Sequence, residues 1–232
     1  MFKELDVLFE SSTIKPTFER VHIILALLIF GENREGIGRY RLKEELLIGS
    51  GTARSLITKL RNAGFIDVPE FSHKKGSENL RRGHVLTVKG LRYLEKINEY
   101  IPFVREGDLS KLKEIIIESE GINPYICQVK DRANKITNGI DQRDAAIKID
   151  GNGATCLIFN GEAIVFPQKS ISNTNKDHWK ISDKVSDYFI KLKNERNNKG
   201  IVLEKNDVII IGLGNSVQKA RLAALNAALT LI

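Results

Sequence analysis

Cysteine and histidine are scarce in this sequence, which argues against metal centres and disulfide-built domains. Among 232 residues there are two cysteines, Cys127 and Cys156, and each lies in an apolar run. Two such thiols fit buried residues in a reducing cytosol, because small disulfide-built domains carry many more. The four histidines are scattered, and none lies within helical reach of another or of a cysteine: His22, His73, His84 and His178. The sequence therefore predicts no metal site and no bound cofactor.

Long hydrophobic runs are also missing. The longest apolar run, 21–30, is too short to span a bilayer and is interrupted by His22. The first ten residues, MFKELDVLFE, do not have the profile of a signal peptide. We therefore expect a cytoplasmic protein that has no membrane partner.

Familiar catalytic motifs are absent from the sequence. It contains no Walker motif, no Gly-x-Ser-x-Gly and no pair of carboxylates that stands out. Catalytic residues can come from distant positions, so this absence does not exclude an enzyme.

Positive charge is plentiful, and it is unevenly distributed. The net charge is +7. Residues 38–92 contain twelve lysines and arginines against five acidic residues, whereas residues 106–232 contain eighteen against sixteen. The positive field therefore belongs to the N-terminal third, and a local basic patch is typical of a protein that binds a polyanion.

The N-terminal part reads as helices followed by a hairpin, within an α+β chain. The predicted elements are helices at 16–30, 40–47 and 51–63, strands at 65–71 and 84–88, and a helix at 89–101. The two strands enclose a charged excursion. The buried residues of the first helix include His22, which we expect to be a partnered core or interface histidine. Apolar residues in FKELDVLFE have helical spacing, and they fit a dimer face and packing within the domain equally well.

The helix at 51–63 has two dissimilar faces. Ala53, Leu56, Ile57 and Leu60 form one apolar stripe, opposite short polar and cationic side chains. Ser50 is a candidate N-cap, and Gly64 is well placed as the glycine that follows the helix.

These segments resemble the winged helix-turn-helix domain of prokaryotic transcription regulators. The residues that carry the resemblance are RYRLKEELLIGSGTARSLITKLRNAGFI and LTVKGLRYLEKI, within 16–100. The second phrase resembles the LT-x-x-G that follows the wing in such regulators. The resemblance implies binding of double-stranded DNA, with the helix at 51–63 in the major groove.

The predicted DNA contacts come from this helix and from the tip of the hairpin. Arg54 is the best candidate to contact guanine, because its guanidinium can donate hydrogen bonds to O6 and N7 at the same time. The alternative for each residue is an ordinary solvated surface. The full set is Ser50, Thr52, Arg54, Ser55, Thr58, Lys59, Lys74, Lys75, Arg81 and Arg82.

A mixed α/β domain is predicted after the DNA-binding part. We place the first domain at 1–103, a connecting segment at 104–123 and the second domain at 124–232. Its predicted elements are strands at 125–130 and 145–150, a hairpin at 154–167, a helix at 182–197, a strand at 206–216 ending in a glycine turn, and a closing helix. Asn160-Gly161 in the hairpin is typical of a type I′ turn.

The whole chain resembles archaeal proteins that pair a winged helix with a C-terminal domain of unknown function. The matching residues are RDAAIKIDGNGAT and NDVIIIGLGNSVQKARLAALNAAL. This resemblance implies a two-domain architecture and a regulatory role.

Two stretches of the second domain are candidate small-molecule sites. Glycines after a strand let a ligand approach the backbone, and a helix N-terminus offers N–H groups to an anion. The candidates at the end of the strand are Gly212, Gly214, Asn215 and Ser216. The alternative there is a strand-to-helix turn with an Asn or Ser cap. Arg143 and Asp144 form the second candidate, as a buried polar region, against the alternative of a surface turn.

The expected function is DNA-binding transcription regulation. The C-terminal domain would sense a small molecule, mediate homodimerisation, or both, since dimers bind paired half-sites. Two alternatives stay open: an enzyme of cofactor or nucleotide metabolism that carries a regulatory winged helix, and a protein–protein adaptor.

Overall fold

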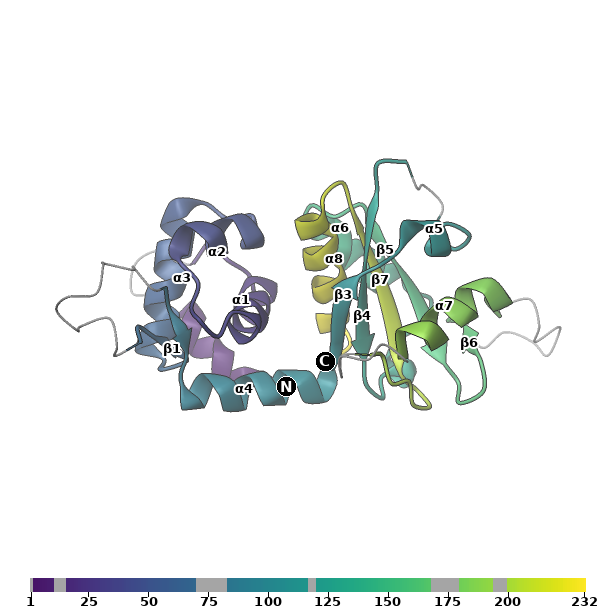
Figure 1. Cartoon of the computed structure of the whole chain (residues 1–232), viewed down its shortest axis with the longest axis horizontal. Helices are drawn as coiled ribbons and strands as arrows, with labels where there is room; N and C mark the ends of the chain where they lie inside the picture. The colour runs from purple at the N-terminus through teal and green to yellow at the C-terminus, as the bar shows by residue number, and fades with distance from the viewer. Residues whose placement is uncertain (1, 11–15, 70–82, 117–119, 168–179, 194–199) are drawn as a thin grey trace. The chain divides into compact units, whose positions relative to one another are not determined.

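The computed structural model describes residues 2–10, 16–69, 83–116, 120–167, 180–193 and 200–232. The chain is mixed α+β with antiparallel sheets, and it divides into two compact units, Met1–Ile97 and Asn98–Ile232. The elements of both are drawn in Figure 1.

The first unit is mostly helical. Its elements are η1 (Lys3–Phe9), α1 (Arg20–Glu32), α2 (Arg39–Leu46), α3 (Ser50–Asn62), β1 (Ile66–Asp67), β2 (Val85–Leu86) and α4 (Val88–Tyr100), which continues into the second unit. β1 and β2 pair antiparallel, and an antiparallel bridge joins Ile37 to His84 beside them. The predicted helices and the strand pairing are confirmed, although both described strands are shorter than predicted.

The start of α1 was predicted at Pro16, and that prediction is wrong. The helix begins at Arg20 because Glu19 caps it: its side chain accepts from the His22 N–H, and His22 Nδ1 accepts from the Glu19 N–H at 2.9 Å. His22 is buried, which confirms the partnered core histidine. This burial lowers the pKa of His22.

The N-terminal apolar residues are buried within their own unit. Phe2, Leu5 and Leu8 on or beside η1 are almost fully inaccessible, and η1 contacts α3. Of the two interpretations of this segment, packing within the domain is therefore the one observed.

The ends of α3 are fixed by glycine and by backbone bonds. Gly64 has a φ of +74°, its N–H donates to Arg61 O, and Phe65 N donates to Leu60 O at 2.9 Å. These bonds are the two of a Schellman motif, which confirms the predicted role of Gly64. The predicted Ser50 cap is wrong, because Gly49 is the N-cap and Ser50 is the first helical residue.

The second unit contains a five-stranded antiparallel sheet of order β3-β4-β7-β5-β6. Helices α6 and α8 cover one face, and α5 and α7 cover the other (Figure 1). The element bounds are β3 (Phe103–Glu106), α5 (Leu109–Leu112), β4 (Asn123–Val129), η3 (Ala133–Lys135), α6 (Ile140–Lys148), β5 (Gly153–Phe159), β6 (Ile164–Val165), α7 (Asp183–Lys193), β7 (Val208–Gly214) and α8 (Val217–Leu229). The predicted connection at 104–123 thus contains most of β3 and all of α5.

Two local predictions in the second unit are wrong. The predicted strand at 145–150 is mostly the end of α6, where Gln142 and Ala146 are buried four residues apart and Ile147 is exposed. The hairpin turn is a four-residue loop rather than a two-residue type I′ turn, since Phe159 pairs with Ile164. Asn160 Oδ1 closes this loop by accepting from the N–H groups of Glu162 and Ala163.

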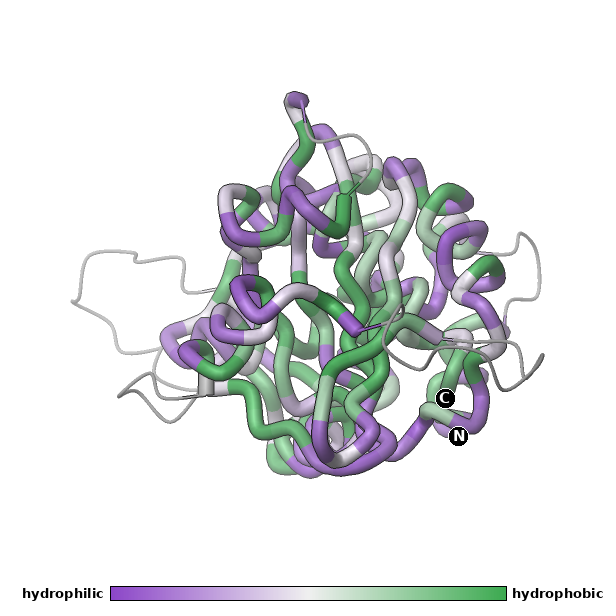
Figure 2. Tube along the Cα trace, turned by 90° about the vertical axis from the view of Figure 1, so that its right-hand side faces the viewer, coloured by the Kyte–Doolittle hydropathy of each residue, from purple (hydrophilic) through white to green (hydrophobic). Residues whose placement is uncertain are grey.

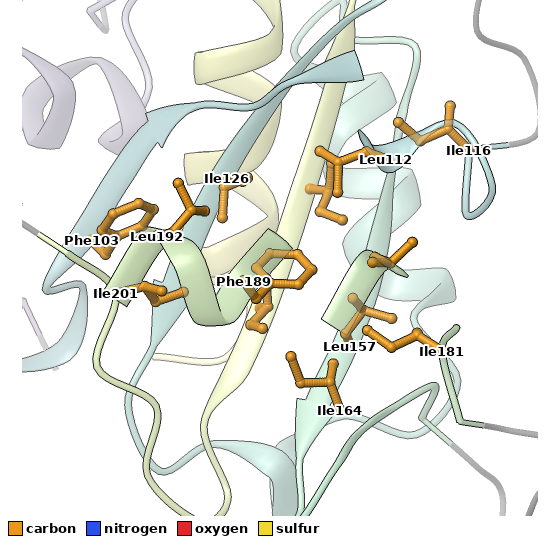
Figure 3. Close-up of a cluster of buried hydrophobic side chains, with 13 residues drawn as sticks. Phe103, Leu112, Ile116, Ile126, Leu157, Ile164, Ile181, Phe189, Leu192 and Ile201 are labelled. Carbon is orange, nitrogen blue, oxygen red and sulfur yellow. The ribbon is translucent and has the colours of Figure 1, made fainter. Parts of the chain in front are cut away.

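A hydrophobic cluster joins the sheet to α7. Figure 3 shows Phe189 and Leu192 of α7 facing Ile126 and Leu157 of the strands. A helix that packs on a sheet in this way needs apolar residues on one side and polar residues on the other. Several helical coils in Figure 2 accordingly change between hydrophobic green and hydrophilic purple within each turn.

Candidate nucleic-acid interface

Helix α3 buries its apolar stripe and exposes the predicted DNA-contacting face. Ala53, Leu56, Ile57 and Leu60 are buried. The six polar residues predicted on this helix differ in exposure: Ser50, Arg54 and Thr58 are exposed, whereas Thr52, Ser55 and Lys59 are half-buried. The structure therefore brings these six onto one helix and separates them into two groups.

Thr52 and Lys59 are held by the N-terminal segment. The hydroxyls of Thr52 and Thr17 lie 2.7 Å apart, and Lys59 Nζ donates to Glu10 O at 2.6 Å. Both partners are far away in the sequence, so no local pattern signals the contacts. These bonds occupy one edge of the predicted face, and Ser50, Arg54 and Thr58 on the other side are exposed.

Arg54 lies on the exposed part of α3. Within the described ranges, no hydrogen bond or ion pair is found for its guanidinium. Thr58 follows one helical turn later and is also exposed. A long cationic side chain and a hydroxyl on successive turns can reach base edges and phosphates.

Arg61 is a cationic residue of the same helix that the predicted site leaves out. Its Nη2 lies 3.3 Å from Asp67 Oδ1, and the same oxygen accepts from Val68 N at 2.8 Å. Asp67 belongs to β1, so this ion pair ties the end of α3 to the base of the hairpin. The positive charge of Arg61 was visible in the sequence, but its partner was not.

The four predicted cationic contacts of the hairpin tip cannot be placed. Lys74, Lys75, Arg81 and Arg82 lie outside the described residues. The base of the hairpin is described, where Ile66 pairs with Leu86 and Asp67 with Val85.

A half-buried arginine and an exposed tyrosine, Arg39 and Tyr40, begin helix α2 in a cation–π contact. The Arg39 guanidinium lies 5.0 Å from the centre of the Tyr40 ring, and Arg39 Nη2 donates to the Tyr40 hydroxyl at 3.3 Å. Tyr40 is 68% exposed. Sequence reasoning missed this pair, although the dipeptide RY at a helix start was a visible signal.

Gly212 and Gly214 lie within β7 rather than in a turn after it. A Cβ at Gly212 would lie 2.2 Å from Ala224 N, and one at Gly214 would lie 2.4 Å from Ala220 N. Both glycines therefore allow α8 to approach the strand closely. The Ser216 hydroxyl accepts from Lys219 N at 3.2 Å as the N-cap of α8, and Asn215 is exposed beside it.

Arg143 and Asp144 are not buried, so of the two alternatives the buried polar region is not observed, and the exposed position has the form of a helix rather than of a turn. They are neighbours on α6, with Arg143 Nη2 2.8 Å from Asp144 Oδ1, and more than half of each side chain is exposed. The pair lies on a surface helix.

Among the described residues of the second unit, Asp207 is the buried charged residue, and the sequence analysis did not single it out. It is fully inaccessible and lies immediately before β7. Its carboxylate accepts from Gln128 Nε2 at 2.6 Å, from Glu204 N at 2.9 Å and from Asp131 N at 3.0 Å, and Lys130 Nζ lies 3.5 Å away. Lys130 also pairs with Glu204, and this contact lowers the Glu204 pKa.

In the parts of the chain that are placed, no three histidine, cysteine or acidic side chains form a group that could hold a metal ion. No helix within those same ranges is long and apolar enough to cross a membrane.

Comparisons with known proteins match the C-terminal region and the fold. Residues 121–231 match the model of a domain of unknown function, DUF4443. The solved structure of a hypothetical protein from the archaeon Pyrococcus horikoshii OT3 is similar, with a TM-score of 0.61 and 23% identity over 92% of this chain and 93% of that chain. No curated protein matches the sequence. At this identity the likeness shows a shared fold, in agreement with the predicted resemblance to archaeal proteins that end in a domain of unknown function.

Proposed function

We propose that the first unit is a winged helix-turn-helix that binds duplex DNA and that the chain regulates transcription. The observation that carries the proposal is α3, an amphipathic helix whose exposed face is polar and cationic. The surrounding elements support it, because α1, α2 and α3 are followed by the antiparallel pair β1 and β2. The surplus of positive charge over residues 38–92 supports a polyanionic partner.

Arg54 is the residue that we assign to base recognition. A helix fits the major groove of B-DNA, and the N-terminal half of a recognition helix contacts the bases. Arg54 lies in that half, is exposed, and carries the donor fork that matches O6 and N7 of guanine. Ser50 and Thr58, also exposed, would contact phosphates or base edges on either side.

Selection of binding sites from a random duplex library, followed by titration of the selected DNA, tests the proposal. Arg54→Ala should lower the affinity for the selected site by roughly 1–3 kcal/mol and relax the base preference at one position. Arg92→Ala is the matched control, because it removes an exposed arginine from α4. It should leave the base preference unchanged. A wild-type chain that enriches no sequence, and whose DNA binding does not weaken with salt, would refute the proposal.

For the second unit we propose dimerisation, small-molecule sensing, or both. Ile140 and Ile147 favour dimerisation, since they lie seven residues apart on α6 and are 45% and 50% exposed. A homodimer would present two copies of α3 to paired half-sites. Light scattering of the intact chain, with and without DNA, measures this state directly.

A further inference from the structure

Helix α3 carries two arginines on one exposed stripe. Arg54 and Arg61 are seven residues apart, and seven residues make almost two turns of an α-helix. Their side chains therefore leave the helix in directions that differ by only about 20°. Both are exposed, whereas Thr52 and Lys59 of the same helix bond to Thr17 and Glu10 of the N-terminal segment.

The separation of the two arginines matches a short stretch of DNA. Seven residues at 1.5 Å per residue place their Cα atoms about 10 Å apart along the helix axis. Successive base pairs are stacked about 3.4 Å apart. Arg61 lies in the last turn of α3, so it can contact a base only if the helix lies along the major groove rather than entering it by its N-terminal half alone. In that arrangement two arginines at this separation can reach base pairs up to about three steps apart.

Asp67 restrains the second arginine. One carboxylate oxygen of Asp67 accepts from the backbone N–H of Val68 at 2.8 Å, and the same oxygen lies 3.3 Å from Arg61 Nη2. This contact engages one edge of the guanidinium and leaves its other N–H groups available. Asp67 is itself fixed by the pairing of β1 with β2.

We propose that Arg61, positioned by Asp67, reads a second guanine up to about three base pairs from the one read by Arg54. The inference rests on the proposed DNA-binding function of α3. Asp67 acts through Arg61 and is a positioning residue. An acidic side chain beside the DNA backbone weakens binding to every sequence, so its expected benefit is discrimination between sequences.

The experiment compares four variants on the DNA that the wild-type chain selects and on its single-base substitutions: Arg54→Ala, Arg61→Ala, Asp67→Asn and the charge-matched control Glu95→Gln on α4. Arg61→Ala should lower discrimination roughly 5- to 150-fold at one guanine, distinct from the position affected by Arg54→Ala. Asp67→Asn should lower discrimination at that same guanine while affinity for unrelated DNA stays equal or rises. Glu95→Gln should change neither preference. Thermal melting of each variant verifies that it is folded.

Two results would overturn the inference, and they can be told apart. If Arg61→Ala weakens all sequences equally while Arg54→Ala changes one base preference, Arg61 contacts phosphate and only the second-guanine assignment fails. If the wild-type chain selects no sequence, the proposed function fails and the inference fails with it. A loss of discrimination at the same position in Arg61→Ala and Asp67→Asn supports the inference.

Discussion

The buried carboxylate of Asp207 allows a quantitative test of the second unit. Asp207→Ala would remove the common acceptor of three donors, Gln128 Nε2, Glu204 N and Asp131 N. It would also leave Lys130, whose side chain is only 25% exposed, with Glu204 as its remaining ion-pair partner among the described residues. These contacts join the turn before β7 to the end of β4, so the change acts where two central strands are aligned.

The expected loss of stability follows from the burial. Hydrogen bonds to a charged group contribute about 1.5–3 kcal/mol each, but three bonds to one carboxylate are not additive. Removing one partner of a buried ion pair costs about 3–5 kcal/mol. Lys130 keeps its contact with Glu204 and part of its hydration, which limits the cost. We therefore expect Asp207→Ala to lower the free energy of unfolding of the second unit by about 3–4 kcal/mol.

Urea denaturation of the intact chain, followed by circular dichroism, measures this loss, and calorimetry assigns it to one of the two units. Glu204→Gln is the control, because it removes the exposed partner of Lys130 and keeps the backbone N–H that Asp207 accepts. It should change the stability little. A loss below about 1 kcal/mol for Asp207→Ala would contradict the reasoning, since it would mean that the three donors find other partners at no cost.

Two further predictions concern packing and protonation. Gly212→Ala should destabilise the second unit by about 1–3 kcal/mol, because the new Cβ would overlap Ala224 N of α8. Gly51→Ala on α3 should instead stabilise the first unit by roughly 0.5–1 kcal/mol, because a Cβ there meets no atom within 4 Å and alanine favours the helix. Equal thermal unfolding shifts for these two variants would refute the packing argument. Burial lowers the pKa of His22 below its usual 6.5, so the unfolded chain binds the proton more readily. The free energy of unfolding of the first unit should be constant above pH 6.5 and fall as the pH drops from 6.5 toward the pKa of His22 in the folded chain. His22→Gln should weaken this pH dependence. An unchanged pH profile would exclude His22 as its source.

Local periodicity was sufficient to predict α3. Its apolar stripe repeats at helical spacing, and burial of Ala53, Leu56, Ile57 and Leu60 confirms it. Gly64 was predictable for the same reason, since a glycine directly after a periodic segment is a local signal. The strand predicted at 145–150 failed because alternation over a few residues also fits a helix end. Ala145 and Ile149 are not the buried residues there; Ala146 is.

Contacts between distant segments were out of reach of the same reasoning. The polar residues of α3 were read as one face, yet Thr52 and Lys59 bond to Thr17 and Glu10. Nothing in the spacing of α3 distinguishes a lysine that reaches a backbone carbonyl 49 residues away from one that faces solvent. Tertiary contacts, not the local sequence, determine which polar residues of α3 remain free to bind DNA. They limit the proposed DNA contacts to the side of the helix that carries Arg54.

Unlike the tertiary contacts of α3, the close packing of α8 on the glycines of β7 had a signal in the sequence. Gly212 and Gly214 are two residues apart, so both lie on the same face of a strand. Ala220 and Ala224 are four residues apart, so both lie on the same face of the following helix. Two surfaces without side-chain bulk, on consecutive elements, allow a helix backbone to approach a strand backbone, and the clearances at both glycines show that it does. A glycine after a strand is therefore evidence for a ligand site only when the next helix offers no matching small residues, and α8 offers them.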